Sequence, residues 1–374
     1  MKIKFLDLRK EYLRIKREID DSLFNVLEST DFIKGQSVTD FESKLKKYTN
    51  SKYVITCGNG TDAIQASLMA FNFPRNSEVL IPSFTYIATA EVVSLLGLKP
   101  VFVDVNIDTF NIDINDFRSK ITNKSVAVLP VNLYGQSCEI EKVIEISKEF
   151  NLKVIEDNAQ SFGAEYKKLS GKIVKTGTLS DVSTTSFFPS KSLGCFGDGG
   201  AIFSNNDKIS EKIKMICNHG QIEKYYHEII GINSRLDTIQ ASILLKKLKI
   251  LDSQILRRQK NAKFYIENLD TNNIILPEVS PFSNHIYHQF TIKLISNNVR
   301  DKLQLYLSEK GIPSVIYYPI PIHHQNAFKN IETKINSLSN SETLSKIVLS
   351  LPIHPELSKT ELEYILKTVN SFFK

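Results

Sequence analysis

Short, almost continuous apolar runs recur through the first half of the chain, separated by segments with helical periodicity. The apolar runs cover residues 53–57, 78–82, 100–104, 125–130 and 153–157. Such runs are typical of strands that are covered on both faces. Between them, apolar residues recur at helical spacing over 61–70, 87–96, 114–121 and 140–150. This alternation predicts an α/β fold whose mostly parallel sheet lies between layers of helices.

Two longer helical patterns and a mixed tail complete the chain. Residues 8–29 predict one amphipathic helix, and residues 236–269 predict a long helix that links the sheet to the C-terminal part of the chain. The tail combines a strand-like piece at 288–294 with further helical patterns, which indicates a smaller C-terminal α/β domain. We therefore expect a large domain over 1–240 and a small domain over 241–374.

Composition and charge exclude several classes of protein. The chain has 374 residues, of which 42% are hydrophobic and 24% are charged, as in ordinary globular proteins. Its net charge of +6 is spread over helix-like segments, so we expect no nucleic-acid partner. We also expect no membrane span, and no secretory signal at the start. The four cysteines form no CxxC pair and no HExxH accompanies His323 and His324, so we expect no metal site. Four cysteines in a chain of this length do not form a disulfide framework, so we expect a cytoplasmic location.

Chemically useful residues follow the predicted strands, where ligands bind in sheets of this kind. Asp157 ends one strand, and it could hold a cation, a metal or a protonated ring nitrogen, or only cap a helix. Lys191 follows a second apolar run and lies among aromatic residues before a glycine-rich loop. Desolvation there would favour the neutral, nucleophilic amine.

Two further strand ends carry groups that suit a flat, phosphorylated ligand. Gly60 and Thr61 open a helix directly after a strand, and the N–H groups of such a helix start bind phosphate. Neither a GxGxxG nor a GxxxxGK[ST] pattern is present, which disfavours dinucleotide and P-loop sites. Phe84 or Tyr86 could stack on a ring. Lysine, carboxylate, phosphate cup and aromatic together match the needs of pyridoxal 5'-phosphate.

Three ordered blocks resemble the DegT/DnrJ/EryC1/StrS family of sugar aminotransferases, which are pyridoxal-phosphate enzymes of fold type I. The blocks are EDNAQS at 156–161, SFFPSK at 186–191 with GDGGA at 197–201, and GINSRLD at 231–237. The resemblance covers essentially the whole chain. It implies an aspartate aminotransferase-like large domain with a smaller C-terminal domain.

The resemblance also implies roles for individual residues. Lys191 corresponds to the lysine that binds the cofactor covalently, and Asp157 to the partner of its ring nitrogen. The other matches are Gln160 for the phenolic oxygen, Gly60, Thr61 and Ser186 for the phosphate, and Tyr86 for ring stacking. Asn233 matches a residue that reaches the cofactor phosphate of a neighbouring subunit. The family thus implies a homodimer with shared active sites.

The implied reaction moves an amino group from L-glutamate to C3 of a nucleotide-linked keto sugar. The amino-acid sequences of the blocks favour a UDP-linked 3-keto-2-acetamido uronate, which is used for O-antigen or other surface polysaccharide. The alternative is amination at C4 of a UDP- or dTDP-linked 4-keto-6-deoxy sugar. Arg235 would pair with the sugar carboxylate, and His219 matches a loop near the substrate. Asn132 and Tyr317 stand where many relatives have His, and we expect both to face the sugar. A regulatory protein on this fold would have lost Lys191 or Asp157.

Overall fold

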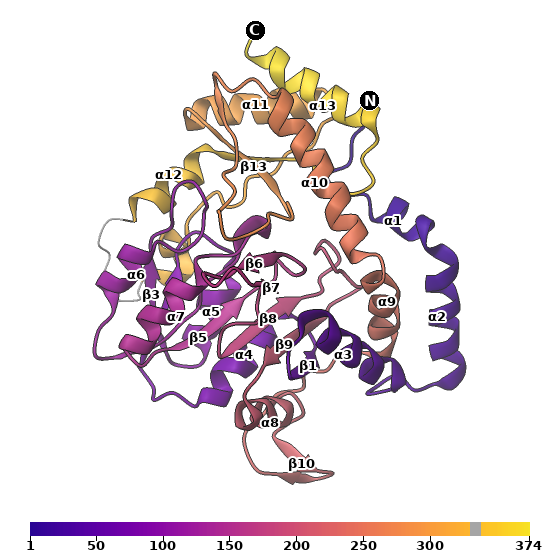
Figure 1. Cartoon of the computed structure of the whole chain (residues 1–374), viewed down its shortest axis with the longest axis vertical. Coiled ribbons are helices and arrows are strands. Elements are labelled where there is room, and N and C mark those ends of the chain that lie inside the picture. Colours follow the sequence, from indigo (N-terminus) through magenta and orange to yellow (C-terminus); the bar gives the residue numbers. More distant parts are fainter. Residues whose placement is uncertain (330–337) are drawn as a thin grey trace.

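A seven-stranded sheet forms the centre of the computed structural model, which describes residues 1–329 and 338–374 (Figure 1). The strand order is β1-β9-β8-β5-β4-β2-β3. Within this sheet, β9 runs antiparallel to both of its neighbours, and the other pairs are parallel. The bounds are β1 Tyr53–Cys57, β2 Glu78–Pro82, β3 Lys99–Val103, β4 Ser125–Val128, β5 Lys153–Asp157, β8 Val182–Ser186 and β9 Gly200–Ser204. The predicted α/β architecture is confirmed.

Helices cover both faces of this sheet, which explains the continuous apolar runs. One face packs against α4 (Gly60–Phe71), α5 (Ala88–Leu95) and α8 (Asp207–Ile216). The other face packs against α6 and α7 at one end, and against α3 and α9 at the other. The bounds of these helices are α6 Ile114–Lys120, α7 Ile140–Glu149, α3 Gln36–Thr49 and α9 Thr238–Leu248.

A second, three-stranded antiparallel sheet lies at the other end of the molecule (Figure 1). It consists of β12 (Ile274–Ile275), β13 (Phe290–Leu294) and β14 (Val348–Leu351). Its apolar core includes side chains of α10 (Leu251–Asn268), α11 (Asn297–Glu309) and α13 (Lys359–Phe372), together with Ile3 from the chain start. The smaller C-terminal unit has the expected elements, and the boundary at 240/241 stays a prediction.

Two segments that periodicity predicted as single helices are each divided in the structure. Residues 8–29 form α1 (Leu8–Arg14) and α2 (Lys16–Ser29), and 236–269 form α9 and α10. α9 packs in the core beneath the large sheet, whereas α10 continues into the core of the small sheet. Because each half keeps its own apolar face, periodicity alone does not register the break between them.

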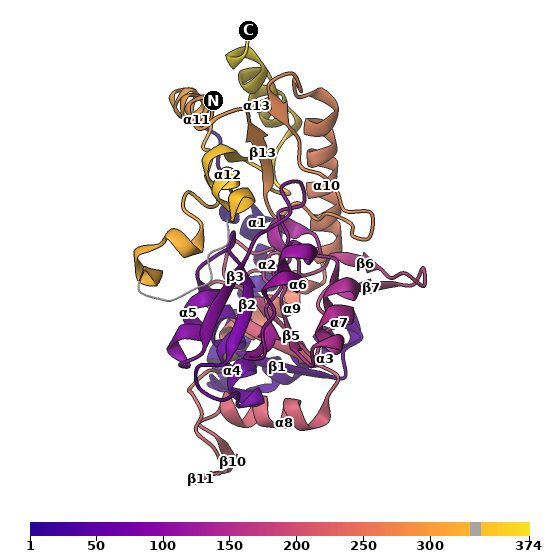
Figure 2. The ribbon, with the colours of Figure 1, turned by 90° about the vertical axis from the view of Figure 1, so that its left-hand side faces the viewer.

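Short hairpins and turns connect the larger elements. The hairpin of β10 (Gln221–Glu223) and β11 (Tyr226–His227) projects from the end of the molecule below α8, and the hairpin of β6 (Glu165–Lys167) and β7 (Ile173–Lys175) projects from its side (Figure 2). The remaining elements are η1 (Leu133–Gly135), η2 (Ile322–His324), η3 (Asn326–Phe328) and α12 (Ser339–Ile347). Along the described residues, every helix is too short or too polar to cross a bilayer.

Candidate functional site

The carboxyl ends of two adjacent strands bring the predicted site residues to one edge of the large sheet. β5 ends at Asp157 and β8 ends at Ser186, and these parallel strands pair with Asp157 opposite Thr184. α4 begins at Gly60 beside the end of β8, since an added Cβ on Gly60 would lie 2.7 Å from Ser186 Cβ. Three predicted segments therefore converge.

Lys191 lies in a turn that is anchored by its neighbours. Its backbone N–H donates to the carbonyl of Phe188 at 2.8 Å, and Phe187 is fully buried and exchanges backbone hydrogen bonds with Gly199 and Cys195. Burial lowers the pKa of the Lys191 ammonium, and the negative charge of Asp157 acts in the opposite direction. The loop therefore holds an amine that is easier to deprotonate than a surface lysine.

Asp157 is buried, and one of its two carboxylate oxygens has a partner in the chain. Burial raises the pKa of its carboxyl, while the N–H of Ala159, which donates to Oδ1 at 3.0 Å, and the charge of Lys191 lower it. In the described residues no helix starts at Asp157, so the alternative of a helix cap is wrong. No donor among those residues reaches Oδ2, which leaves that oxygen for a ligand.

Gln160 connects the strand edge to an aromatic cluster. Its Oε1 accepts the backbone N–H of Tyr134 at 2.8 Å, and its Nε2 donates to the hydroxyl of Tyr318 at 3.1 Å. The ring of Tyr318 lies next to those of Phe84 and Tyr86, with centroid distances of 6.1 and 6.4 Å. Tyr86 is 59% exposed and Phe84 is 1% exposed, so of the two aromatics that could stack on a ring, only Tyr86 is open to a ligand.

The start of α4 has the features of a phosphate cup. The side chain of Asn59 accepts the N–H of Asp62, and Asn59 O accepts the N–H of Ala63. Within the described chain no acceptor contacts the N–H of Gly60 or Thr61. Two free donors at a helix N-terminus favour an anion.

The structure corrects the expectation for Asn132, which does not face a sugar. Its side chain is fully buried, donates from Nδ2 to Glu156 and Asn158 at 2.7 and 3.0 Å, and accepts the N–H of Cys138 at 2.9 Å. Asn132 instead satisfies a buried carboxylate next to Asp157. Tyr317, the other expected sugar contact, is half-buried and lies directly before Tyr318.

The block at residues 231–237, which contains Asn233 and Arg235, lies at the base of the β10–β11 hairpin. The exposed Asn233 forms an isolated bridge with Asn218, whose side chain accepts from Arg235 Nη1 at 3.3 Å. His219 is also exposed, and its carbonyl lies 2.9 Å from Nδ1 of His227. Ser234 ties this segment to the α4 start, donating to Asp62 at 2.7 Å and accepting from Gly58 N–H at 2.9 Å.

The sequence reasoning missed one histidine near the lysine. Burial, and then the positive charge of Lys191, lower the pKa of His288 well below its usual value, so its imidazole is neutral. Its Nδ1 is buried without a hydrogen-bond partner in the part of the chain that the structure describes. A lone His beside an apolar strand carries no pattern that would have signalled this position.

The assembled edge fits a pyridoxal 5'-phosphate cofactor on its own geometry. Such a cofactor requires a desolvated amine, here Lys191, and a carboxylate oxygen open to its ring nitrogen, here on Asp157. It also requires a polar group beside its ring, here the amide of Gln160, and a helix start for its phosphate, here at Gly60. Together with the sheet, they define a pyridoxal-phosphate enzyme of fold type I.

Comparisons with known proteins agree with this class. The model of the DegT/DnrJ/EryC1/StrS aminotransferase family matches residues 13–370, and the chain belongs to this family. It is 42% identical to UDP-2-acetamido-2-deoxy-3-oxo-D-glucuronate aminotransferase of Pseudomonas aeruginosa, over 97% of this chain and 98% of the relative. It is 41% identical to dTDP-3-amino-3,6-dideoxy-alpha-D-galactopyranose transaminase of Aneurinibacillus thermoaerophilus, over 99% of both.

A solved structure extends the agreement to the cofactor. NtdA of Bacillus subtilis, solved with the bound cofactor PMP, superposes with a TM-score of 0.88 at 31% identity, covering 95% of this chain and 81% of that one. The protein is a pyridoxal-phosphate-dependent aminotransferase.

Proposed function

We propose that this enzyme transfers the amino group of L-glutamate to C3 of a nucleotide-linked keto sugar, with a UDP-linked 3-keto-2-acetamido uronate as the first candidate. The observation that carries the proposal is the convergence of Lys191, Asp157 and the α4 start on one sheet edge. The 3-oxo uronate in the name of the Pseudomonas relative supports the position and the sugar. The cytoplasmic location stays a prediction.

In this proposal each residue of the edge has a separate task. Lys191 Nζ binds the cofactor covalently and, once displaced, moves the proton to and from the reacting carbon. Asp157 keeps the ring nitrogen protonated, so that the cofactor serves as an electron sink. Gln160 binds the phenolic oxygen, and Gly60, Thr61 and Ser186 hold the phosphate. Tyr86, the exposed aromatic, would stack on the cofactor ring.

The same proposal includes a homodimer with shared active sites. The β10–β11 hairpin projects from the molecule (Figure 2), and apolar side chains on it and just after it are exposed: Ile222, Tyr225, Tyr226 and Ile230. Exposed apolar side chains gathered on one feature mark interaction surfaces. A second copy that covers this hairpin would receive Asn233 and His219 at its own site. Sedimentation of the wild type and of Ile230→Asp tests this; a wild-type monomer would refute the dimer.

Positive charge at the base of the hairpin suits an anionic sugar nucleotide. Burial, and then the positive charges of Arg235 and Lys214, lower the pKa of Lys34, so the three cations act on one another. A guanidinium can bind a carboxylate through two parallel hydrogen bonds. In this proposal Arg235 binds the carboxylate of the uronate, and Lys34 and Lys214 bind the diphosphate.

A spectroscopic titration with defined keto sugars tests the proposal. The enzyme is first converted with L-glutamate, excess donor is removed, and recovery of the visible absorbance of the bound cofactor is followed. The panel contains a UDP-linked 3-keto uronate, a dTDP-linked 3-keto-6-deoxy hexose and 4-keto-6-deoxy sugars. Recovery with the uronate alone supports the proposal, whereas recovery with a 4-keto sugar alone refutes the C3 assignment. Lys191→Ala serves as the control, and we expect it to abolish turnover.

A further inference from the structure

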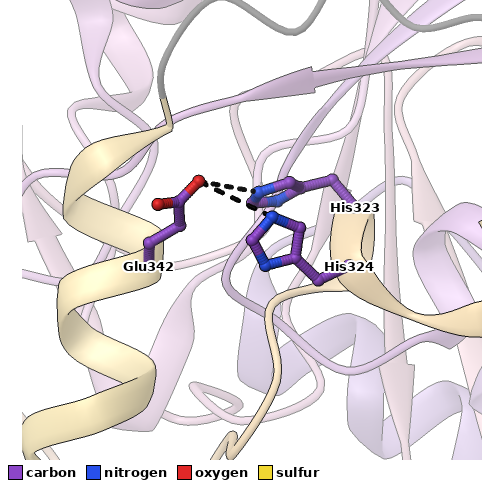
Figure 3. A group of neighbouring side chains, drawn as sticks. All are labelled: His323, His324 and Glu342. Atoms are coloured by element: carbon purple, nitrogen blue, oxygen red, sulfur yellow. Dashed lines mark hydrogen bonds and ion pairs between the residues drawn. The ribbon is translucent and has the colours of Figure 1, made fainter.

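Two histidines and a glutamate meet on the α5 side of the large sheet. His323 and His324 belong to η2, and Glu342 belongs to the first turn of α12 (Figure 3). Their ligand atoms all lie within 4.8 Å of one another. The sequence pattern did not indicate this group, because Glu342 is far along the chain from the histidine pair.

The carboxylate lies at distances from the two imidazoles that suit a shared metal as well as a long hydrogen bond. Glu342 Oε1 lies 3.4 Å from His323 Nε2 and 3.7 Å from His324 Nε2. A direct bond between imidazolium and carboxylate is shorter, at about 2.7–2.9 Å. Zinc–ligand bonds of about 2.0–2.2 Å in a tetrahedron place neighbouring ligand atoms roughly 3.3–3.6 Å apart. Both carboxylate–imidazole distances are close to this range.

The surrounding structure holds these groups in place. Ser83 Oγ lies 2.5 Å from His323 Nδ1; when it accepts the proton on that nitrogen, Nε2 has a free lone pair facing the group. Such an outer partner is usual for a metal-binding histidine. At the start of α12, the buried Asp104 accepts the N–H groups of Asn340 and Ser341 at 2.9 and 2.8 Å, which fixes the turn that carries Glu342.

Exposure leaves one side of the group open. The side chain of His323 is 0% exposed, while those of His324 and Glu342 are 53% and 36% exposed. A metal could therefore enter from solvent and keep a water molecule as its fourth ligand. Two imidazoles with one carboxylate suit zinc and similar transition metals, whereas magnesium and calcium prefer oxygen ligands alone.

We propose that His323, His324 and Glu342 form a binding site for one Zn²⁺ per chain. The site joins η2 to α12. In the sequence, the site is close to two aromatic residues of the candidate cofactor site, because Ser83 directly precedes Phe84 and η2 follows Tyr318.

Equilibrium dialysis of the cofactor-loaded enzyme, freed of metal by a chelator, tests this proposal directly. We expect one zinc per chain, and the intense visible absorption of four-coordinate Co²⁺ when cobalt replaces zinc. His324→Ala and Glu342→Gln should each weaken zinc binding at least tenfold, and Ser83→Ala by about tenfold to a hundredfold. The matched control is His227→Ala, an exposed histidine on the β10–β11 hairpin, which should bind zinc as the wild type does.

A second readout does not depend on counting metal. The melting temperature of the wild type should rise with zinc concentration, because a ligand that binds only the folded state stabilises it. The rise should be absent in His324→Ala, whose side chain is exposed and whose loss should leave the fold intact. Wild-type protein that binds no zinc would overturn the proposal, as would His324→Ala and Glu342→Gln variants that bind it with unchanged affinity.

Discussion

Replacing Gly60 by alanine should selectively weaken binding of the cofactor phosphate. The added Cβ would lie 2.7 Å from Ser186 Cβ and 3.3 Å from both Cα and Oγ of Ser186. Carbon atoms in contact are normally about 3.5–4.0 Å apart. The start of α4 and the end of β8 must therefore separate by roughly 1 Å, and these two elements carry the proposed phosphate ligands.

The size of the effect follows from the donors that move. The N–H groups of Gly60 and Thr61 have no acceptor among the described residues, so a phosphate is their natural partner. A hydrogen bond to a charged group contributes about 1.5–3 kcal/mol. Loss of one such bond predicts a dissociation constant for pyridoxal 5'-phosphate that rises roughly 10- to 150-fold. Gly58→Ala is the matched control, since its Cβ would first meet side-chain oxygens of Asp62 and Ser234 at 3.2 Å.

Titration of the cofactor-free protein with pyridoxal 5'-phosphate and with pyridoxal separates the phosphate from the ring. Gly60→Ala should lose most of its affinity for the phosphorylated compound and little for pyridoxal, and Gly58→Ala should change either value less. If Gly60→Ala weakens both compounds equally, or neither, the α4 start is not the phosphate site.

Three further perturbations test other parts of the structure. Asn132→Leu removes a donor to Glu156 and Asn158 and the acceptor of the buried Cys138 N–H, so the free energy of unfolding should fall by about 3 kcal/mol; unchanged denaturation in urea would contradict this. Arg235→Lys should reduce kcat/KM for a uronate more than for a neutral sugar, and an equal loss would remove the assigned role. Burial lowers the pKa of His354 to about 4, below the unfolded value of 6.5, so the neutral ring takes up a proton on unfolding. Stability should thus fall as pH drops from about 6.5 to 4, and His354→Gln should reduce this dependence by up to about 1.4 kcal/mol per pH unit, measured by denaturation at several pH values.

A candidate cofactor site could be located from the sequence because several of its proposed residues lie at or just after strand ends. Asp157 ends an apolar run, and Gly60 starts a helix directly after another, so both positions follow from local pattern. Parallel strands then bring such ends to one edge of the sheet. The role of Gln160 came instead from family resemblance, because a glutamine in a turn has many uses.

Other features depended on contacts between distant segments. Asn132 stands where many relatives have His, which suggested a sugar contact, yet its buried side chain donates to Glu156 of β5 instead. The zinc-site proposal required α12 to place Glu342 beside η2, with Asp104 fixing that helix start. Neither pairing can be recognised from the spacing of residues along the sequence.

The sequence by itself determined the layers, the strands and the chemical types of the cofactor groups, because period and strand ends are local properties of the chain. Only the tertiary structure decided which polar groups are buried, where the helix over 236–269 breaks, and which side chains remain open to a ligand. These depend on packing between residues far apart in sequence. A side chain is exposed or buried according to the residues that cover it, and this cover sets its pKa and its hydrogen-bond partners.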